Sequence, residues 1–299
     1  ASLDAGRSVL SRVVLALDGH LTVLCEEEGG NTPFPARWAA SVLATSRNLA
    51  DRQALLRAYL SPGDKDPAWM AAEQEQAAQA LGVPVTLVNA QGMEFRLIPA
   101  GSFRMGEVNE TPHKVTLTRA FYLAKTEVTQ GQWKAVMGTE PSLFKKAGSE
   151  APVESVSWED AVDFCSALSH LEGMKPAYGK NRTLLGLETE GYRRPTEAEW
   201  EYACRAGTTG KRCGQIDGMG WYYPTPTPQP VGRKLENAYG LCDMLGNVWE
   251  WCEEVGDMGA ANRGGSLNNP ASYCASGYRN WSVPSDRYSN RGFRPARLP

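Results

Sequence analysis

The side chains between Arg263 and Arg294 have the chemistry of a recognition surface. This stretch is rich in Tyr, Ser, Asn, Gly and Trp, and it contains few aliphatic residues. Aromatic rings supply rigid contact area, and small polar side chains supply adaptable hydrogen bonds. Because neither a helical nor a strand period of apolar residues runs through it, we expect no ordinary core element here. A long surface loop without a ligand is the alternative, although long ordered loops are commonly functional.

Residue types that carry out covalent or phosphate chemistry are sparse. The histidines His20, His113 and His170 are scattered and show no i, i+4 spacing, which argues against a Ser-His-Asp triad. Residues 207–211, Gly-Thr-Thr-Gly-Lys, lack the spacing of a phosphate-binding loop. The 7 cysteines are odd in number and form no Cys-x-x-Cys pair, which predicts mostly reduced, buried thiols. They are Cys25, Cys165, Cys204, Cys213, Cys242, Cys252 and Cys274.

The overall composition excludes several classes of partner and location. The net charge of 299 residues is -3 and no basic run occurs, so a nucleic-acid partner is not expected. No apolar run reaches about 18 residues, so no membrane span is expected. Arg7 and Arg12 interrupt the apolar N-terminal stretch, and no signal-peptide pattern results. Together with the cysteines, this favours a cytoplasmic location.

The elements that must position the recognition stretch divide into two predicted domains. Residues 1–85 form a small helical module, with a third helix that starts at Pro67 and ends at Gly82. It has the character of a scaffold or of a domain that docks another protein. Residues 86–299 form an α+β domain with many loops, in which Thr129, Ser157 and Thr196 each start a short capped helix. Strands are predicted at 83–87, 95–106, 115–118, 121–123 and around 248–251.

Several segments, in this order, resemble the formylglycine-generating-enzyme (sulfatase-modifying factor) family. The resemblance covers about residue 90 to the end, and it implies a C-type-lectin-like fold with twisted antiparallel sheets, two main helices and long loops. The matching segments are Ile98-Pro-Ala-Gly-Ser-Phe-Arg-Met-Gly106, Glu127-Val-Thr129, Pro152-Val-Glu-Ser-Val-Ser-Trp158, Arg194-Pro-Thr-Glu-Ala-Glu-Trp200, Gly240-Leu-Cys-Asp-Met-Leu-Gly-Asn-Val-Trp-Glu-Trp251, Arg263-Gly-Gly-Ser266 and Gly292-Phe-Arg294.

The chemistry of that family does not transfer fully to this chain. Its aerobic enzymes bind copper(I) through two thiols, whose places fall on Asn269 and Cys274, and an amide cannot replace a thiolate for this soft ion. A second branch uses iron held by histidines, which this chain lacks in suitable spacing. The resemblance therefore implies no catalysis and no cofactor here. Family members also hold calcium near positions matching Asp243, with carbonyls around Gly246 and Val248, so Asp243 and Asn247 are turn residues or oxygen ligands.

Within this fold, residues 263–294 resemble the variable region of a variable protein from a diversity-generating retroelement, a bacterial or prophage system. In such regions, adenine-directed mutation changes some residues and leaves others the same; we call the unchanged residues the steady frame. At the position of Leu267, such variable regions usually have an aromatic residue, so this chain departs from the pattern there. The steady frame is matched by Arg263, Gly264, Gly265, Ser266, Ala271, Cys274, Ser276, Arg279, Pro284, Arg287, Gly292, Phe293 and Arg294.

The resemblance implies a display protein that binds a variable protein or surface ligand through solvent-facing side chains. We call the changeable residues the variable positions; among them Tyr273, Tyr278, Trp281 and Tyr288 are the expected anchors. The glycines permit tight backbone paths, Phe293 packs beneath, and the arginines tie loop carbonyls or carboxylates, unless they are merely solvated. The variable positions are Asn268, Pro270, Tyr273, Ala275, Tyr278, Asn280, Trp281, Ser282, Val283, Asp286, Tyr288, Ser289 and Asn290.

Overall fold

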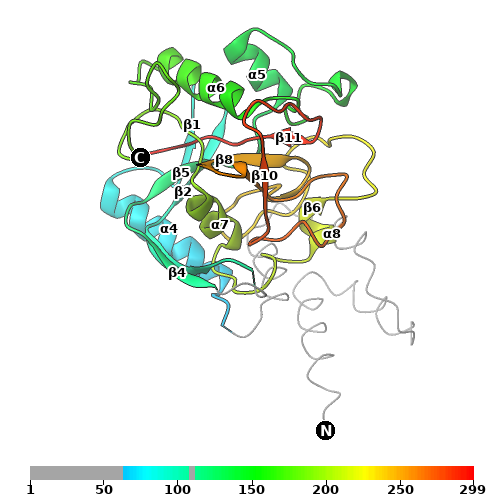
Figure 1. Ribbon diagram of the computed structural model, residues 1–299. Coiled ribbons are helices and arrows are strands. Elements are labelled where there is room, and N and C mark those ends of the chain that lie inside the picture. The colour runs from blue at the N-terminus through cyan, green and yellow to red at the C-terminus, as the bar shows by residue number, and fades with distance from the viewer. Residues whose placement is uncertain (1–62, 108–111) are drawn as a thin grey trace, which may run out of the picture.

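Short capped helices and short strands joined by long loops make up residues 63–107 and 112–299, the part that the computed structural model describes (Figure 1). The predicted α+β class is confirmed. The helices predicted within residues 1–62 lie outside the described part. The helices are α4 (Pro67–Leu81), α5 (Gln130–Met137), the 3-10 turn η2 (Lys145–Ala147), α6 (Trp158–Leu171), α7 (Glu197–Arg205) and α8 (Ile216–Met219). No described helix has the length and apolar character needed to cross a membrane.

The three predicted capping boxes are all present. The side chains of Thr129, Ser157 and Thr196 accept hydrogen bonds from the backbone N–H three residues later, at the start of α5, α6 and α7. The side chain at that third position accepts from the backbone N–H of the cap in return, so two donors at each helix start are satisfied. These local devices let helices of 8 to 14 residues begin at fixed points in a loop-rich chain.

Two four-stranded sheets carry the domain. The first has the order β1-β2-β5-β12 and the second the order β10-β9-β8-β11, with β3-β4 and β6-β7 as separate pairs. The predicted strand, turn and strand within 95–106 are confirmed as β2 and β3. The strands are β1 (Thr86–Val88), β2 (Glu94–Ile98), β3 (Gly101–Met105), β4 (His113–Leu117), β5 (Phe121–Ala124), β6 (Gly220–Trp221), β7 (Leu245–Gly246), β8 (Trp249–Gly256), β9 (Gly259–Arg263), β10 (Arg279–Ser282), β11 (Arg291–Gly292) and β12 (Ala296–Arg297).

The recognition stretch takes part in the second sheet to a greater extent than its composition predicts. β10 is antiparallel to β9, and Trp281 lies opposite Ala261. β11 is parallel to β8, and Arg291 lies opposite Trp249. Two short segments of the stretch are therefore strands, although no strand period of apolar residues runs through it. Apart from Arg263, which lies opposite Arg279, their pairing partners lie outside the stretch, so its own periodicity could not reveal these strands.

The helix α4 belongs structurally to the C-terminal domain. Its predicted limits are confirmed, because Asp66 caps its start and Gly82 ends it in the left-handed conformation. The Gln74 side chain is buried and donates hydrogen bonds to the carbonyls of Leu97 (2.8 Å) and Tyr239 (3.1 Å). Met70 joins the core on which this helix packs. A boundary between residues 85 and 86 therefore separates α4 from its packing partners, and the packed unit begins before Pro67.

The core beneath the C-terminal segment is aromatic and tightly packed. Phe293 is fully buried and meets Trp133 and Phe164 edge to face, with ring centroids 6.3 and 5.3 Å away. Trp251 lies in the same cluster. The six described cysteines are free and buried, as predicted; Cys25 lies outside the described residues. Buried rings thus support the chain on the side opposite to its exposed residues.

Candidate ligand-binding surface

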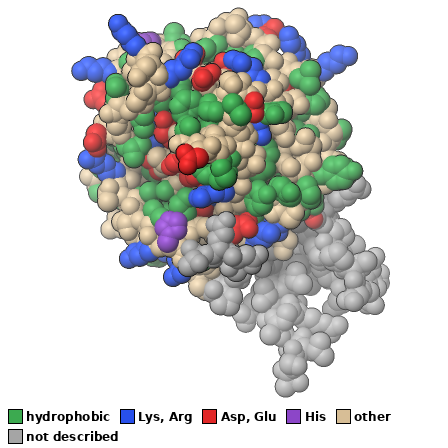
Figure 2. All heavy atoms as spheres, in the orientation of Figure 1, with side chains coloured by type: hydrophobic (Ala, Val, Ile, Leu, Met, Phe, Trp, Pro, Cys, Tyr) green, Lys and Arg blue, Asp and Glu red, His purple; other side chains and the backbone are tan. Residues whose placement is uncertain are grey.

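All but two of the variable positions are exposed or half-buried. Figure 2 shows hydrophobic side chains in broad patches on the face that it draws, with many lysine and arginine side chains toward its outline. Tyr273 and Tyr288 are 38% and 50% exposed. The exposed positions are Asn268, Pro270, Tyr273, Val283 and Tyr288; the half-buried ones are Tyr278, Asn280, Trp281, Asp286, Ser289 and Asn290.

Ala275 and Ser282 are corrections to the predicted set of ligand contacts, because both are buried. Ala275 has no exposed surface and sits in a tight turn, where its N–H donates to Tyr273 and its carbonyl accepts from Tyr278. The Ser282 hydroxyl accepts a hydrogen bond from the buried Asn262 amide at 3.3 Å. Asn262 also accepts one from Asn280 at 3.0 Å. These two positions hold the surface in place and cannot offer their side chains to a partner.

The aromatic anchors are partly ordered by their neighbours. The rings of Tyr273 and Tyr278 lie 4.8 Å apart, and Tyr278 is 6.0 Å from Trp249 below it. The Arg291 guanidinium covers the Tyr288 ring at 4.3 Å. Burial lowers the pKa of Arg291, against the attraction of Tyr288 and Asp286. Rings with few rotatable bonds that are already held in place lose little conformational entropy on binding.

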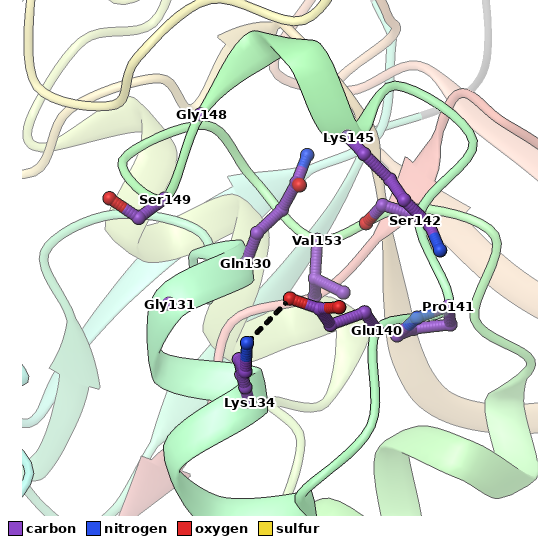
Figure 3. A pocket seen from close by; sticks show the side chains of 10 residues that line it. All are labelled: Gln130, Gly131, Lys134, Glu140, Pro141, Ser142, Lys145, Gly148, Ser149 and Val153. Atoms are coloured by element: carbon purple, nitrogen blue, oxygen red, sulfur yellow. Dashed lines mark hydrogen bonds and ion pairs between the residues drawn. The ribbon is translucent and has the colours of Figure 1, made fainter.

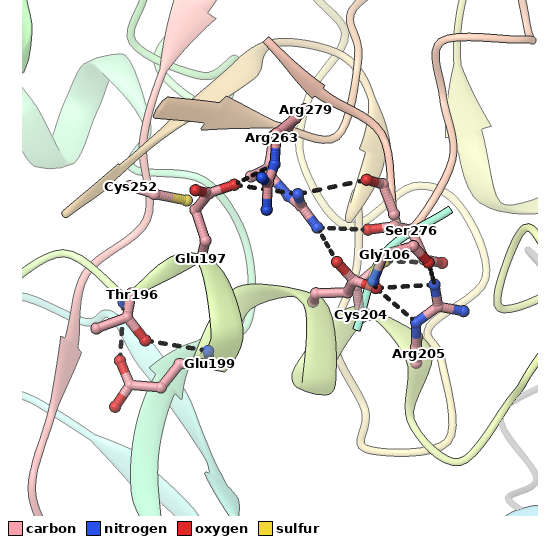
Figure 4. A network of polar contacts seen from close by, with 12 residues as sticks. Gly106, Thr196, Glu197, Glu199, Cys204, Arg205, Cys252, Arg263, Ser276 and Arg279 are labelled. Atoms are coloured by element: carbon pink, nitrogen blue, oxygen red, sulfur yellow. Dashed lines mark hydrogen bonds and ion pairs between the residues drawn. The ribbon is translucent and has the colours of Figure 1, made fainter. Parts of the chain in front are cut away.

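Buried ion pairs fix the backbone on which these side chains are carried (Figure 4). Arg263 is completely buried, forms ion pairs with Glu197 (3.2 Å) and Glu201, and donates to the carbonyl of Ser276 at 2.9 Å. Burial opposes its charge, but the attraction of Glu201 and Glu197 outweighs this and raises the pKa of Arg263. Arg279, half-buried, reaches the same Glu197 at 3.1 Å. One face of α7 thus holds both sides of the turn at 275–278.

Arg294 and Arg287 attach the end of the segment to the rest of the domain. Arg294 is buried, makes a two-point ion pair with Glu250 at 2.7 Å, and donates to the carbonyls of Lys125 and Cys242. Arg287 bonds Asp160 at 2.8 Å but remains exposed, so its contribution is smaller. The predicted tie between arginines and loop carbonyls is therefore strongest at Arg263 and Arg294.

Sequence reasoning missed the partners of these arginines. Glu197 and Glu201 are buried on α7, Glu250 is buried on β8, and Arg212 donates to the Cys274 carbonyl at 2.8 Å. The available signal was the spacing of acidic residues within a helix that also carries buried Trp200. A carboxylate at a position otherwise reserved for apolar residues indicates a buried cation.

Gly265 permits a backbone path that another residue would obstruct. Its φ angle is +76°, and a Cβ there would lie 2.7 Å from the Cys274 sulfur and 3.1 Å from the Cys274 Cα. Both the left-handed backbone and the close approach require glycine. The backbone at Gly265, just before the first variable position, therefore packs directly against Cys274.

The place of the family's two thiols holds one buried thiol and one amide. Cys274 has no exposed surface, and burial raises the pKa of Cys274 to about 11, although Arg212 opposes the shift. It is therefore a neutral thiol near pH 7, whereas copper(I) and nucleophilic chemistry use the thiolate. The Asn269 side chain accepts a hydrogen bond from Ser266. Among residues 63–107 and 112–299, no cluster of three or more His, Cys, Asp or Glu could hold a metal.

Asp243 and Asn247 both occupy turns with φ +55°. The Asn247 amide is fully used, since it donates to Glu127 (3.3 Å) and to the carbonyl of Gln229 (3.2 Å) and accepts from the Gln229 N–H (3.0 Å). Asp243 accepts from the Gly232 N–H at 2.6 Å with one oxygen, while Oδ1 is buried without a partner. Burial raises the pKa of Asp243 to about 6. Asn247 is thus a turn residue, and Asp243 keeps one oxygen available.

A hollow lies away from the variable positions, between α5 and the loop that follows it (Figure 3). Its volume is about 200 Å³, and it is lined by Gln130, Ser142 and Val153 among others. An ion pair between Lys134 and Glu140 (2.8 Å) spans its outer side. Lys134 and Glu140 are exposed and paired with each other, and the third charged residue of the lining, Lys145, is also exposed, so no buried charged group in this hollow would select a ligand.

Comparison with known proteins agrees with this geometry. Residues 84–298 match the family model described as Sulfatase-modifying factor enzyme 1-like domain. The chain is 35% identical to Chaperone protein LppX of Paenibacillus barcinonensis, over 53% of this chain and 70% of that protein. It is 27% identical to Formylglycine-generating enzyme of Mus musculus over 56% of this chain, which spans only half of the mouse protein.

Among solved structures, Treponema denticola variable protein 1 superposes with a TM-score of 0.66 and 31% identity. The match covers 73% of this chain and all of that one. The fold is therefore C-type-lectin-like, as the sequence predicted, with both enzymes and a variable protein among its relatives. Since the family model spans more than two thirds of the residues, from 84 to 298, the chain belongs to the family of sulfatase-modifying factor enzyme 1-like domains.

Proposed function

We propose that this protein is a non-catalytic display protein that binds protein or surface ligands through the variable positions. The observation that carries the proposal is the separation of roles within residues 263–294. Anchors such as Tyr273 and Tyr288 reach solvent, while Arg263 and Arg294 are buried in ion pairs that fix the backbone. A site that must accept many side chains has to lie outside the packed core, where even a methylene group is felt.

The likeness to Treponema denticola variable protein 1, over the whole of that chain, supports the same conclusion. The oxidase alternative, suggested by the formylglycine-generating relatives, requires a second thiol beside Cys274. Asn269 occupies that place with an amide, which is a poor ligand for copper(I). Conversion of a cysteine-containing peptide by the purified protein with copper would restore the oxidase alternative.

The proposal predicts that Trp281→Ala combined with Tyr288→Ala weakens binding to a partner recovered by the wild-type protein. An aromatic anchor that becomes buried on binding commonly contributes about 2 kcal/mol, so we expect a rise in Kd of at least about 30-fold from the loss of one anchor and of up to about 1,000-fold if the two losses add. Surface plasmon resonance measures this change. Tyr288 is 50% exposed, but Trp281 is half-buried and packs against the core. The midpoint of unfolding is therefore measured for the double variant and for each single variant, and binding is compared at a temperature where all are folded.

The matched control is Leu171→Ala with Leu185→Ala, two exposed leucines (55% and 66%) outside the variable positions. We expect the control to bind like the wild type. If the Trp281 and Tyr288 variant binds with unchanged affinity, the proposed function is wrong.

We further propose a structural calcium ion beside Asp243, supported by the unpartnered Oδ1. Calcium takes 6 to 8 oxygen ligands, so main-chain carbonyls near Gly246 and Val248 would complete the set. For a Kd of about 10 μM, calcium at about 1 mM adds about 2.7 kcal/mol to the free energy of unfolding. Thermal unfolding with calcium and with a chelator measures this gain, which Asp243→Asn should abolish. Equal melting temperatures with and without the chelator would show that no calcium ion stabilises this site.

A further inference from the structure

The variable positions border a hollow whose remaining walls are fixed residues. Its volume is about 260 Å³, and it is lined by Asn268, Ser289 and Asn290 on one side. Phe144, Leu267 and the segment 223–226, Tyr-Pro-Thr-Pro, form the other side. None of these fixed residues belongs to the predicted variable positions. The hollow is therefore lined partly by variable positions and partly by residues outside them.

Hydrogen bonds hold the fixed half rigidly against the variable positions. The Tyr223 N–H donates to the Asn269 carbonyl at 2.9 Å, and the Thr225 N–H donates to the Leu267 carbonyl at 3.4 Å. The Phe144 N–H donates to the Glu154 carboxylate at 2.8 Å. The walls are thus formed before any ligand arrives, which reduces the ordering cost of binding.

The size and charge of the hollow define its occupant. Small-molecule and cofactor sites usually enclose about 300–1,000 Å³, so this hollow is below that range and suits one side chain. All of its lining residues are uncharged, and two prolines and two aromatic residues supply apolar walls. A charged side chain would lose its hydration there without gaining a partner of opposite charge.

The rim of the hollow offers hydrogen bonds that match one peptide unit. The Asn290 amide group donates to Ser266 Oγ (3.2 Å) and Asn268 Oδ1 (3.0 Å). The Asn290 main-chain carbonyl accepts from the Trp249 N–H, whereas within the described part of the chain the side-chain oxygen of Asn290 and the side-chain amide group of Asn268 have no hydrogen-bond partner. A free acceptor and a free donor on two side chains that contact each other can complement the N–H and C=O groups of an extended backbone.

Resting on the proposed display function, we propose that this hollow is a constant subsite for one uncharged aromatic or branched aliphatic side chain of the protein target. The side chain enters between Tyr223 and Phe144, which are outside the variable positions, and in this version of the surface its backbone amide also meets Asn268 and Asn290. The variable positions then contact the target residues that surround this side chain and determine which target is bound. Every version of the surface would keep the same minimal requirement, an exposed apolar residue on an accessible segment.

Amino-acid amides serve as probes of the subsite. We would titrate the full chain, labelled with nitrogen-15, with N-acetyl-phenylalaninamide, N-acetyl-leucinamide and N-acetyl-lysinamide, and follow backbone amide shifts. For ligands of this size we expect a Kd of about 1 mM for the two apolar probes, with shifts concentrated at Tyr223, Thr225, Asn268, Ser289 and Asn290. The lysine derivative should bind at least about tenfold more weakly.

Variants separate the subsite from the rest of the surface. Tyr223→Ala should weaken the apolar probes at least about fivefold, and Tyr223 is 63% exposed, so folding is not at risk. Leu143→Ala, 69% exposed and outside the lining, is the matched control and should bind normally. Asn268→Trp should block the entrance from an exposed position.

The outcomes distinguish this inference from the proposed function. Absent or non-saturating shifts, equal binding of the lysine derivative, or unchanged binding by both Tyr223→Ala and Asn268→Trp would overturn the subsite. The Trp281 and Tyr288 double variant should still bind the apolar probes while it loses the target. If it retains the target but the probes bind as expected, the display function fails and the subsite alone survives.

Discussion

Replacing Arg263 by methionine is expected to lower the free energy of unfolding by about 3–5 kcal/mol. The substitution keeps the approximate length of the side chain but removes the cation that Glu197 and Glu201 share, leaving Glu197 only the half-buried Arg279 and Glu201 only Arg205. It also removes the donor to the Ser276 carbonyl. Breaking one side of a buried ion pair is costly because the remaining charges cannot be rehydrated. Urea unfolding followed by tryptophan fluorescence measures the change.

Arg182→Met is the matched control for this prediction. Arg182 also makes a two-point contact with its partner, Asp163, at 2.7 and 2.9 Å, but both side chains are more than 40% exposed. Exposed pairs contribute about 0–1 kcal/mol, so this variant should unfold almost like the wild type. Equal losses in the two variants would show that burial does not determine the strength of the Arg263 contacts.

Replacing Ala275 by tyrosine is expected to destabilise the protein by at least about 3 kcal/mol. Ala275 has no exposed surface, and a tyrosine ring cannot be placed there without moving the turn between Tyr273 and Tyr278. Overpacking by single methylene groups costs about 1–3 kcal/mol, and a whole ring exceeds this. Expression level and the midpoint of thermal unfolding would record the effect.

Val283→Tyr provides the comparison, since Val283 is 56% exposed and stands in the same predicted set. We expect it to unfold within about 0.5 kcal/mol of the wild type, as surface substitutions do. A library that randomises both positions should therefore keep small residues at 275 and many residues at 283. Free acceptance of aromatic residues at 275 would contradict the burial of this position.

Local patterns in the sequence predicted local structure well. A hydroxyl residue followed three positions later by Gln, Asp or Glu identified the starts of α5, α6 and α7, because capping depends only on neighbouring residues. Pro67 and Gly82 identified the limits of α4 for the same reason. The fold followed from the motif segments, whose order resembles the family that residues 84–298 match.

Long-range relations could not be predicted in the same way. The partners Glu197 and Glu201 lie more than sixty residues before Arg263, and no pattern in the recognition stretch indicates them. The burial of Ala275 and Ser282 depends on Cys274, Asn262 and the opposite strand, which composition does not reveal. The packing of α4 depends on one buried amide, Gln74, which sequence patterns assign to the surface.

The ion pairs that join α7 and β8 to Arg263 and Arg294 make folding of the domain depend on residues near the C-terminal end of the described chain. Glu197, Glu201 and Glu250 emerge from the ribosome before Arg263 and Arg294, so their ion pairs with these two arginines form only after the later residues follow. The strand pairing of Ala296 with Leu123 closes the first sheet only at the very end. We expect a chain that stops within residues 263–294 to lack these contacts and to be open and sensitive to proteases.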